Sequence, residues 1–197
     1  HEHDSAGDNF KKIARLSNNY TPPEYACNTY RVLYSKLKEF EKQIDIGIME
    51  AGLGGRLDST TACNNHLLLF TAISMDHHDI LGNSIQKITK EKAGAILKKQ
   101  QHCISVEQPL QTTKILSNRA QKIGTNIIFL NPKTRINFKL KFLSGFHQIE
   151  NANLAKEAID FLNVYYNTSI KLGSIKQSIY NTRWNGRFQI IAKEPTV

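Results

Sequence analysis

The sequence predicts an α/β fold built on a mostly parallel, doubly wound sheet. Short apolar runs that contain β-branched residues occur at 44–49, 67–74, 102–106 and 126–130. Runs of this length are typical of strands that are buried on both faces of a parallel sheet. Segments of helical periodicity lie between and around them, and this alternation of strands and helices indicates a single α/β domain.

Helices are predicted where apolar residues recur every three or four positions. These segments are 24–40, 84–99, 111–122, 149–166 and 172–180. Gly124 is expected to end the third of them as a C-terminal cap. The segment 136–143 is different, because apolar and basic residues alternate along it. That period of two predicts a half-exposed antiparallel strand.

The composition is that of a folded protein, with 197 residues, 40% hydrophobic and 22% charged. The net charge of +9 favours a lysine-rich solvated surface. Attraction of polyanions is the alternative, although no arginine stripe with interleaved aromatic residues indicates nucleic acid. We therefore expect no nucleic-acid partner.

Three widely spaced cysteines indicate reduced thiols rather than a disulfide framework or a zinc site. No apolar run reaches the ~18 residues of a membrane span, and residues 1–4 have mixed charge unlike a signal peptide. These features lead us to expect a cytoplasmic protein without membrane contact. Residues 1–20 are polar and aperiodic, which predicts a poorly ordered N-terminal segment.

A glycine-rich turn follows the first predicted strand. Glu50 ends that strand, and Gly52-Leu53-Gly54-Gly55 comes next. A carboxylate at the carboxyl end of a parallel strand, beside such a turn, is where open α/β sheets place ligand chemistry. Alone the signal is weak, because GLGG is not a complete dinucleotide or P-loop fingerprint and a solvated glutamate beside a tight turn would look the same.

Two later segments strengthen the interpretation. His77 follows the second predicted strand, and Lys92 lies on the helix predicted over 84–99. A carboxylate and an imidazole together suit a divalent metal.

Four ordered motifs carry a family resemblance. They are MEAGLGGRLDST, SMDHHDILGNSIQKITKEKAGAI, GFHQIENANLAKEA and RWNGRFQII. In this order they resemble folylpolyglutamate synthase/dihydrofolate synthase of the Mur ligase superfamily. The resemblance implies a Mur-ligase-like central ATP-binding domain over 21–182, with 183–197 as the start of an interdomain linker.

The resemblance also implies a reaction. ATP phosphorylates a carboxylate of folate or dihydropteroate, and the amine of L-glutamate attacks the acyl phosphate to form an amide. Cations must neutralise the approaching anions, so the implied cofactors are ATP and Mg²⁺. We expect a monomeric ligase of folate metabolism with these small-molecule substrates.

Three residues match the family's metal and catalytic positions. Glu50 would be a magnesium ligand, and His77 would hold a second metal. Lys92 matches a lysine that is carbamylated in this superfamily and acts as an anionic group beside the metals. The alternatives are a satisfied polar histidine, and a helix-surface lysine paired with Glu91 or Glu157.

Four further residues match nucleotide-binding positions. His147, Gln148 and Asn151 lie in the segment near adenine and ribose, where an amide can both donate to and accept from a base edge. Arg187 matches an arginine that contacts ATP phosphates. A polar residue near a helix N-terminus and a surface arginine are the alternatives, and Trp184 is interpreted as packing.

The sequence departs from the family in two large respects. No G-x-x-x-x-G-K-[ST] motif is present, and the match ends where the family continues into a smaller C-terminal domain. We expect a domain truncated at both ends and inactive alone. A catalytically dead remnant and another Mur-type ligase, acting on a peptidoglycan precursor, are the alternative functions. The GLGGRLD run favours the folate branch.

Overall fold

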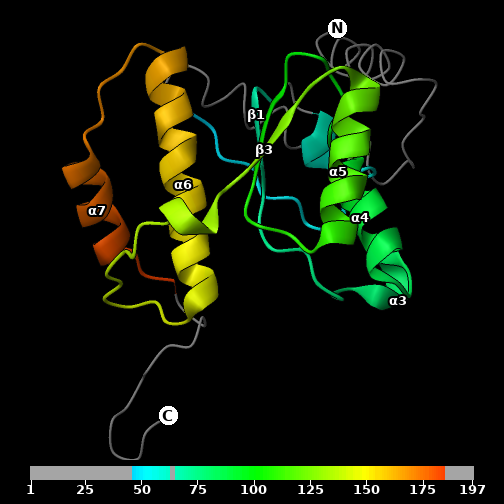
Figure 1. Ribbon diagram of the computed structural model, residues 1–197, viewed down its shortest axis with the longest axis horizontal. Helices are drawn as coiled ribbons and strands as arrows, with labels where there is room; N and C mark the ends of the chain where they lie inside the picture. Colours follow the sequence, from blue (N-terminus) through cyan, green and yellow to red (C-terminus); the bar gives the residue numbers. More distant parts are fainter. Residues whose placement is uncertain (1–45, 63–64, 185–197) are drawn as a thin grey trace, which may run out of the picture. The chain divides into compact units, whose positions relative to one another are not determined.

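A computed structural model describes residues 46–62 and 65–184 (Figure 1). The helix predicted over 24–40, the N-terminal segment 1–20 and Arg187 lie outside these residues. In chain order the elements are η1 (Ser59–Ala62), β1 (Leu67–Phe70), α3 (His78–Leu81), α4 (Ile85–Ala93), β2 (His102–Ser105), α5 (Leu110–Ile123), β3 (Ile127–Phe129), η2 (Pro132–Thr134), α6 (Phe146–Tyr165) and α7 (Leu172–Asn181). No helix within the described ranges combines the length and apolarity needed to cross a lipid bilayer.

The strands form a three-stranded sheet in the order β1-β2-β3. β2 and β3 run parallel, with Cys103 opposite Ile127 and Ser105 opposite Phe129. α5 connects these two strands, so the segment is a β-α-β unit, as parallel pairing requires. The α/β fold with a parallel sheet is therefore confirmed.

The contacts divide the chain into two compact units, which we describe separately. Of the described residues, the first unit contains 46–62, 65–68, 73–102 and 110–126. The second contains 69–72, 103–109 and 127–184.

The core of the first unit lies between α4 and α5. Ile88 and Leu116 are fully buried, and so are Thr89 and Thr112, whose hydroxyl oxygens lie 3.5 Å apart. Ser84 caps the N-terminus of α4, and its hydroxyl accepts a hydrogen bond from the Lys87 N–H. This cap satisfies one of the free amides of the first turn.

α5 ends as predicted. Gly124 has φ +80°, a conformation that glycine adopts without a Cβ penalty. The Thr125 N–H donates to Ala120 O and the Gly124 N–H to Gln121 O, which is the hydrogen-bond pattern of a Schellman motif.

The strand predicted over 44–49 is wrong for the residues that the structure describes. Residues 46–49 have no regular secondary structure, and Ile48 is 93% exposed. A strand needs a neighbour to pair its backbone, and the described sheet does not include this segment. An apolar run alone does not specify that neighbour.

The strand predicted over 136–143 is also wrong. Asn153 of α6 takes both backbone groups of Ile136: its Oδ1 accepts from the Ile136 N–H and its Nδ2 donates to Ile136 O, both at 2.9 Å. A side-chain amide thus satisfies the backbone that a neighbouring strand would have paired. Phe138 is nevertheless buried, so this apolar side chain enters the core although the segment is not a strand.

Two other elements are shorter than predicted. β1 ends at Phe70 rather than at 74, and α4 ends at Ala93 rather than at 99. Residues beyond α4 nevertheless remain in the core, because Ala95 and Ile96 are buried. The apolar pattern therefore continues past the end of α4, because the turn that follows the helix is also buried.

Candidate functional site

The glycine-rich turn is closed by Asp58. One carboxylate oxygen accepts from the Leu53 N–H at 3.0 Å, and the other accepts from the Thr60 N–H at 2.9 Å and the Thr60 hydroxyl at 2.6 Å. Gly54 has φ +68°, which explains a glycine at the tip. The run from Gly52 to Thr60 is therefore a turn that its own aspartate holds in shape.

This turn contacts the C-terminal end of α4. The Arg56 N–H donates to Glu91 O at 2.8 Å. The Arg56 Nε also lies 3.1 Å and 3.0 Å from the two carboxylate oxygens of Glu91. Backbone and side-chain hydrogen bonds therefore both join Arg56, from the glycine-rich motif, to Glu91, from the motif that contains Lys92.

Two glycines permit this close approach. A Cβ on Gly55 would lie 2.7 Å from Lys92 O, and a Cβ on Gly94 would lie 2.8 Å from the Arg56 Cα. Real Cβ atoms do not come so close to backbone atoms. The glycines of GLGG and of Glu-Lys-Ala-Gly therefore interlock at the end of α4.

The three predicted metal and catalytic residues all lie in the first unit. Lys92 is half-buried in the last turn of α4, and Glu50 is exposed just before the glycine-rich turn. His77 is exposed and precedes α3 in a left-handed conformation, φ 53°. Its N–H donates to Asp76 Oδ1 at 2.9 Å. The alternative pairing of Lys92 with Glu91 is not seen, because the Glu91 carboxylate accepts from Arg56.

The described residues contain no cluster of three or more His, Cys, Asp or Glu side chains that would hold a metal by themselves. Mg²⁺ commonly takes only one or two carboxylates, with water and phosphate oxygens as its other ligands. The Glu50 carboxylate fits that preference, whereas the imidazole of His77 is a ligand better suited to transition metals.

Three of the four predicted nucleotide residues, His147, Gln148 and Asn151, lie on the first turns of α6 in the second unit. Asn151 Nδ2 is 3.4 Å from Gln148 Oε1, so these two amides are neighbours. His147 is exposed, and its ring folds back so that a Cβ on Gly145 would lie 2.7 Å from the His147 Cε1. Gly145 has φ +102°, a second reason for glycine before this helix.

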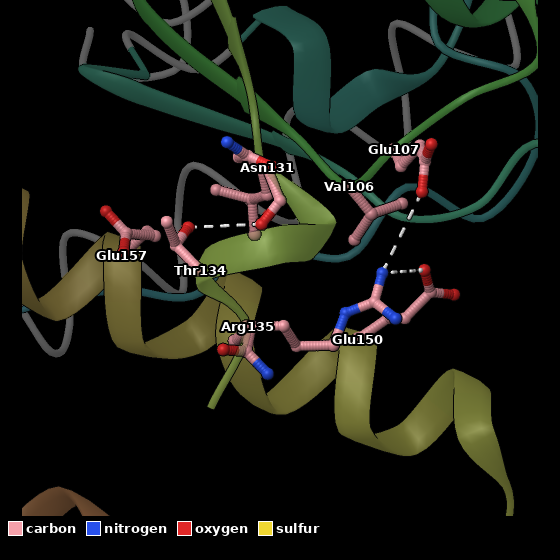
Figure 2. A pocket seen from close by; sticks show the side chains of 9 residues that line it. Val106, Glu107, Asn131, Thr134, Arg135, Glu150 and Glu157 are labelled. Carbon is pink, nitrogen blue, oxygen red and sulfur yellow. Dashed lines mark hydrogen bonds and ion pairs between the residues drawn. The ribbon is translucent and has the colours of Figure 1, made fainter. Parts of the chain in front are cut away.

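The second unit also contains a pocket at the carboxyl ends of β2 and β3 (Figure 2). Arg135 lines this pocket, with its Nη2 3.1 Å from Glu150 Oε1 and 3.9 Å from Glu107 Oε2. The guanidinium carbon lies 4.5 Å from the centre of the Phe146 ring. Glu157 adds a third carboxylate to the lining. The excess of carboxylates makes this pocket unsuited to phosphate.

The sequence interpretation missed several residues that build these sites. They are Asp58, Gly94, Arg135 and Asn153, and Glu91 was considered only as a possible partner of Lys92. Asp58 was detectable, because an aspartate side chain in a turn commonly accepts from the backbone N–H two residues further on, here that of Thr60. The partners of Arg135 and Asn153 lie 15 and 17 residues away, and no sequence spacing indicates such pairs.

Several known proteins are similar to this chain, some in sequence and some in fold. No protein-family model matches the chain. Dihydrofolate synthase/folylpolyglutamate synthase of Bacillus subtilis is 30% identical over 180 residues, which are 81% of this chain and 41% of that protein. The probable folylpolyglutamate synthase of Schizosaccharomyces pombe is 28% identical over 158 residues, 76% of this chain and 30% of that protein. This chain therefore spans less than half the length of these relatives.

Solved structures agree with the fold. The apo form of L. casei FPGS superposes with a TM-score of 0.74 at 19% identity, covering 94% of this chain and 50% of that one. An FPGS–AMPPCP–folate complex gives a TM-score of 0.75 at 18% identity, with the same coverage. Over the part that it covers, the fold of this chain is that of these folylpolyglutamate synthase structures. The chain belongs to the folylpolyglutamate synthase/dihydrofolate synthase family.

Proposed function

We propose that this chain is the central ATP-binding part of an ATP-dependent ligase that adds L-glutamate to folate. Dihydropteroate is the substrate of the second activity named in the family. The observation that carries the proposal is the contact between two family motifs, in which Arg56 binds Glu91 beside Lys92. The sequence identity to the B. subtilis enzyme supports it. We further propose that the protein is a monomer and that it acts in the cytoplasm.

The reaction requires two anions to meet, a carboxylate of the acceptor and the γ-phosphate of ATP. Mg²⁺ would neutralise part of this charge when bound. Glu50 supplies a carboxylate for it, and His77 is the proposed contact of a second cation. The left-handed backbone at His77 supports a functional position, because such residues are found disproportionately at active sites.

Lys92 is proposed to act as a carbamate. The lone pair of its neutral amine attacks carbon dioxide, a C–N bond forms, one C=O π pair moves onto oxygen, and the amine proton passes to solvent. The product is an anionic group at the end of α4, next to the glycine-rich turn. It would orient the cations rather than react with the substrate.

The amides of Gln148 and Asn151 are proposed to contact the adenine edge, with His147 beside them. Amide groups offer donors and acceptors side by side, which matches a base edge. Arg187, which is proposed to contact phosphate, lies outside the described residues.

The test is glutamate-dependent ADP release by the protein in the form that its own cells make. ADP release that requires both glutamate and folate supports the proposal. Release with a peptidoglycan precursor instead would favour another Mur-type ligase, and no release with any acceptor would favour a catalytically dead remnant. Folate-dependent stabilisation of the fold separates the first two by an independent measurement.

A further inference from the structure

We propose that Glu91 is a positioning residue which, through Arg56, fixes the last turn of α4 and thereby the place of the Lys92 side chain. The role given to Lys92 rests on the proposed function. The contacts between Glu91 and Arg56, from which the positioning is inferred, are independent of that function.

Glu91 is held to the glycine-rich turn by two kinds of bond. Its backbone carbonyl accepts from the Arg56 N–H at 2.8 Å, and its carboxylate accepts from the Arg56 Nε at 3.0 Å and 3.1 Å. The turn itself is closed by Asp58, so Arg56 projects from a shaped loop. The last turn of α4 is therefore docked onto a preformed surface.

The same docking constrains the Lys92 backbone. Lys92 O faces Gly55, where a Cβ would approach within 2.7 Å, and the Ala95 N–H donates to that oxygen at 3.1 Å. On the other side Gly94 lies against the Arg56 backbone. The peptide of Lys92 is thus enclosed between the turn and the residues that end α4.

Glu91 does not act by pairing with Lys92. Adjacent residues on a helix do not face each other, and the Glu91 carboxylate already accepts from Arg56. Its side chain is 28% exposed and that of Arg56 is 50% exposed, and ion pairs this exposed contribute little to stability. Removal of the pair should therefore change the local geometry without unfolding the chain.

The first experiment measures how fast an amine-reactive reagent labels Lys92, with peptide mass spectrometry as the readout. Lys90, which is exposed on the same helix, is the internal reference. Glu91→Gln is expected to speed Lys92 labelling about two- to fivefold, the population change that an exposed ion pair can produce. Glu107→Gln, which removes the same charge in the second unit, should leave the rate unchanged.

A charge reversal provides the rescue. Arg56→Glu alone places two carboxylates together and should speed labelling further. Combining it with Glu91→Arg restores an opposite-charge pair at the same place, and the rate should return toward that of the wild type. Labelling that is unchanged in Glu91→Gln, or not rescued in the double variant, would overturn the inference.

A second measurement separates this inference from the proposed function. With ¹³C-bicarbonate, the carbamate on Lys92 should give a carbonyl NMR signal that Lys92→Arg removes and Glu91→Gln weakens. Absence of the signal in the wild type would contradict the role proposed for Lys92, while the labelling rates would still decide the positioning. A full signal in Glu91→Gln at unchanged labelling would contradict the positioning alone.

Discussion

At the scale of single residues, position 94 must be glycine because a side chain has no room there, not because of its backbone conformation. Its φ of −59° is open to any residue, but an added Cβ would overlap the Arg56 backbone. We expect Gly94→Ala to lower the free energy of unfolding by about 3 kcal/mol, at the upper end for overpacking, because backbone atoms yield less than side chains. Urea denaturation measures it.

The matched control for this change is Gly173→Ala in α7. An added Cβ there meets nothing within 4 Å. Alanine in a helix is favoured over glycine by about 0.5–1 kcal/mol, so this variant should be as stable as the wild type or slightly more stable. Equal stability of Gly94→Ala and Gly173→Ala would refute the packing argument.

The thiol of Cys103 is expected to lower the free energy of unfolding as the pH rises above 9. Its side chain is fully buried, and burial raises the pKa of the thiol to about 12 from an ordinary 9.0. Between pH 9 and pH 12 the unfolded chain loses this proton while the folded chain keeps it, so stability falls as the pH rises. The slope from this one group is at most about 1.4 kcal/mol per pH unit.

Cys103→Ala removes that contribution. The variant should therefore lose stability less steeply than the wild type between pH 9 and pH 11, although alanine lowers its stability at every pH. Denaturation series at pH 6–8, where the thiol is protonated in both states, should give equal slopes. Parallel curves for the two proteins up to pH 11 would contradict a buried, protonated thiol.

At the scale of elements, Asn153 joins α6 to the segment after η2. Its amide makes three hydrogen bonds, two of them to Ile136 and one to Ile149 O. Asn153→Ala removes the partner of the half-buried Ile136 N–H, whereas Ile136 O still accepts from the Phe138 N–H. We expect this loss to cost about 1–3 kcal/mol. Faster amide hydrogen exchange at Ile136 is the specific sign of this loss.

Asn151→Ala is the control on the same helix. Asn151 is half-buried, and its bond to Gln148 is long at 3.4 Å. Its removal should change stability by less than about 0.5 kcal/mol. If both variants lost the same stability, the special role of Asn153 would be wrong.

The elements that the sequence predicted well are those fixed by local chemistry. α5 has a regular apolar period and a glycine that caps it, and both are visible in the chain itself. The two strands that were wrong depend on a partner. Residues 136–143 alternate as a strand does, yet the backbone of Ile136 bonds to a side chain 17 residues away. An alternating pattern cannot distinguish these two partners.

The same division holds for the candidate site. The motifs singled out Glu50, His77 and Lys92, and all three lie in the first unit, but their roles stay predictions. The ion pair between Arg56 and Glu91 spans 35 residues, so its formation depends on the fold rather than on spacing. Sequence reasoning thus singled out the residues proposed for the chemistry, but it did not predict the contact between Arg56 and Glu91 beside Lys92.

At the scale of the whole molecule, the proposed function predicts nucleotide-linked stability. A ligand that binds only the folded state stabilises it by RT ln(1 + [L]/Kd), about 2.7 kcal/mol at a hundredfold excess over Kd. Addition of Mg²⁺ and a non-hydrolysable ATP analogue should therefore raise the melting temperature of the 197-residue chain. Asn151→Ala, which leaves the fold intact, should reduce that shift, because the proposed adenine contact is lost.

Three results would each say something different about the binding. A shift with the analogue alone that Mg²⁺ does not increase would contradict the proposed role of Glu50, and Glu50→Gln should then behave as the wild type does. A shift that Asn151→Ala leaves intact would place adenine elsewhere than on the first turns of α6. The absence of any shift would mean that this part of the protein does not hold nucleotide by itself, because these residues supply too few of the contacts that a triphosphate needs.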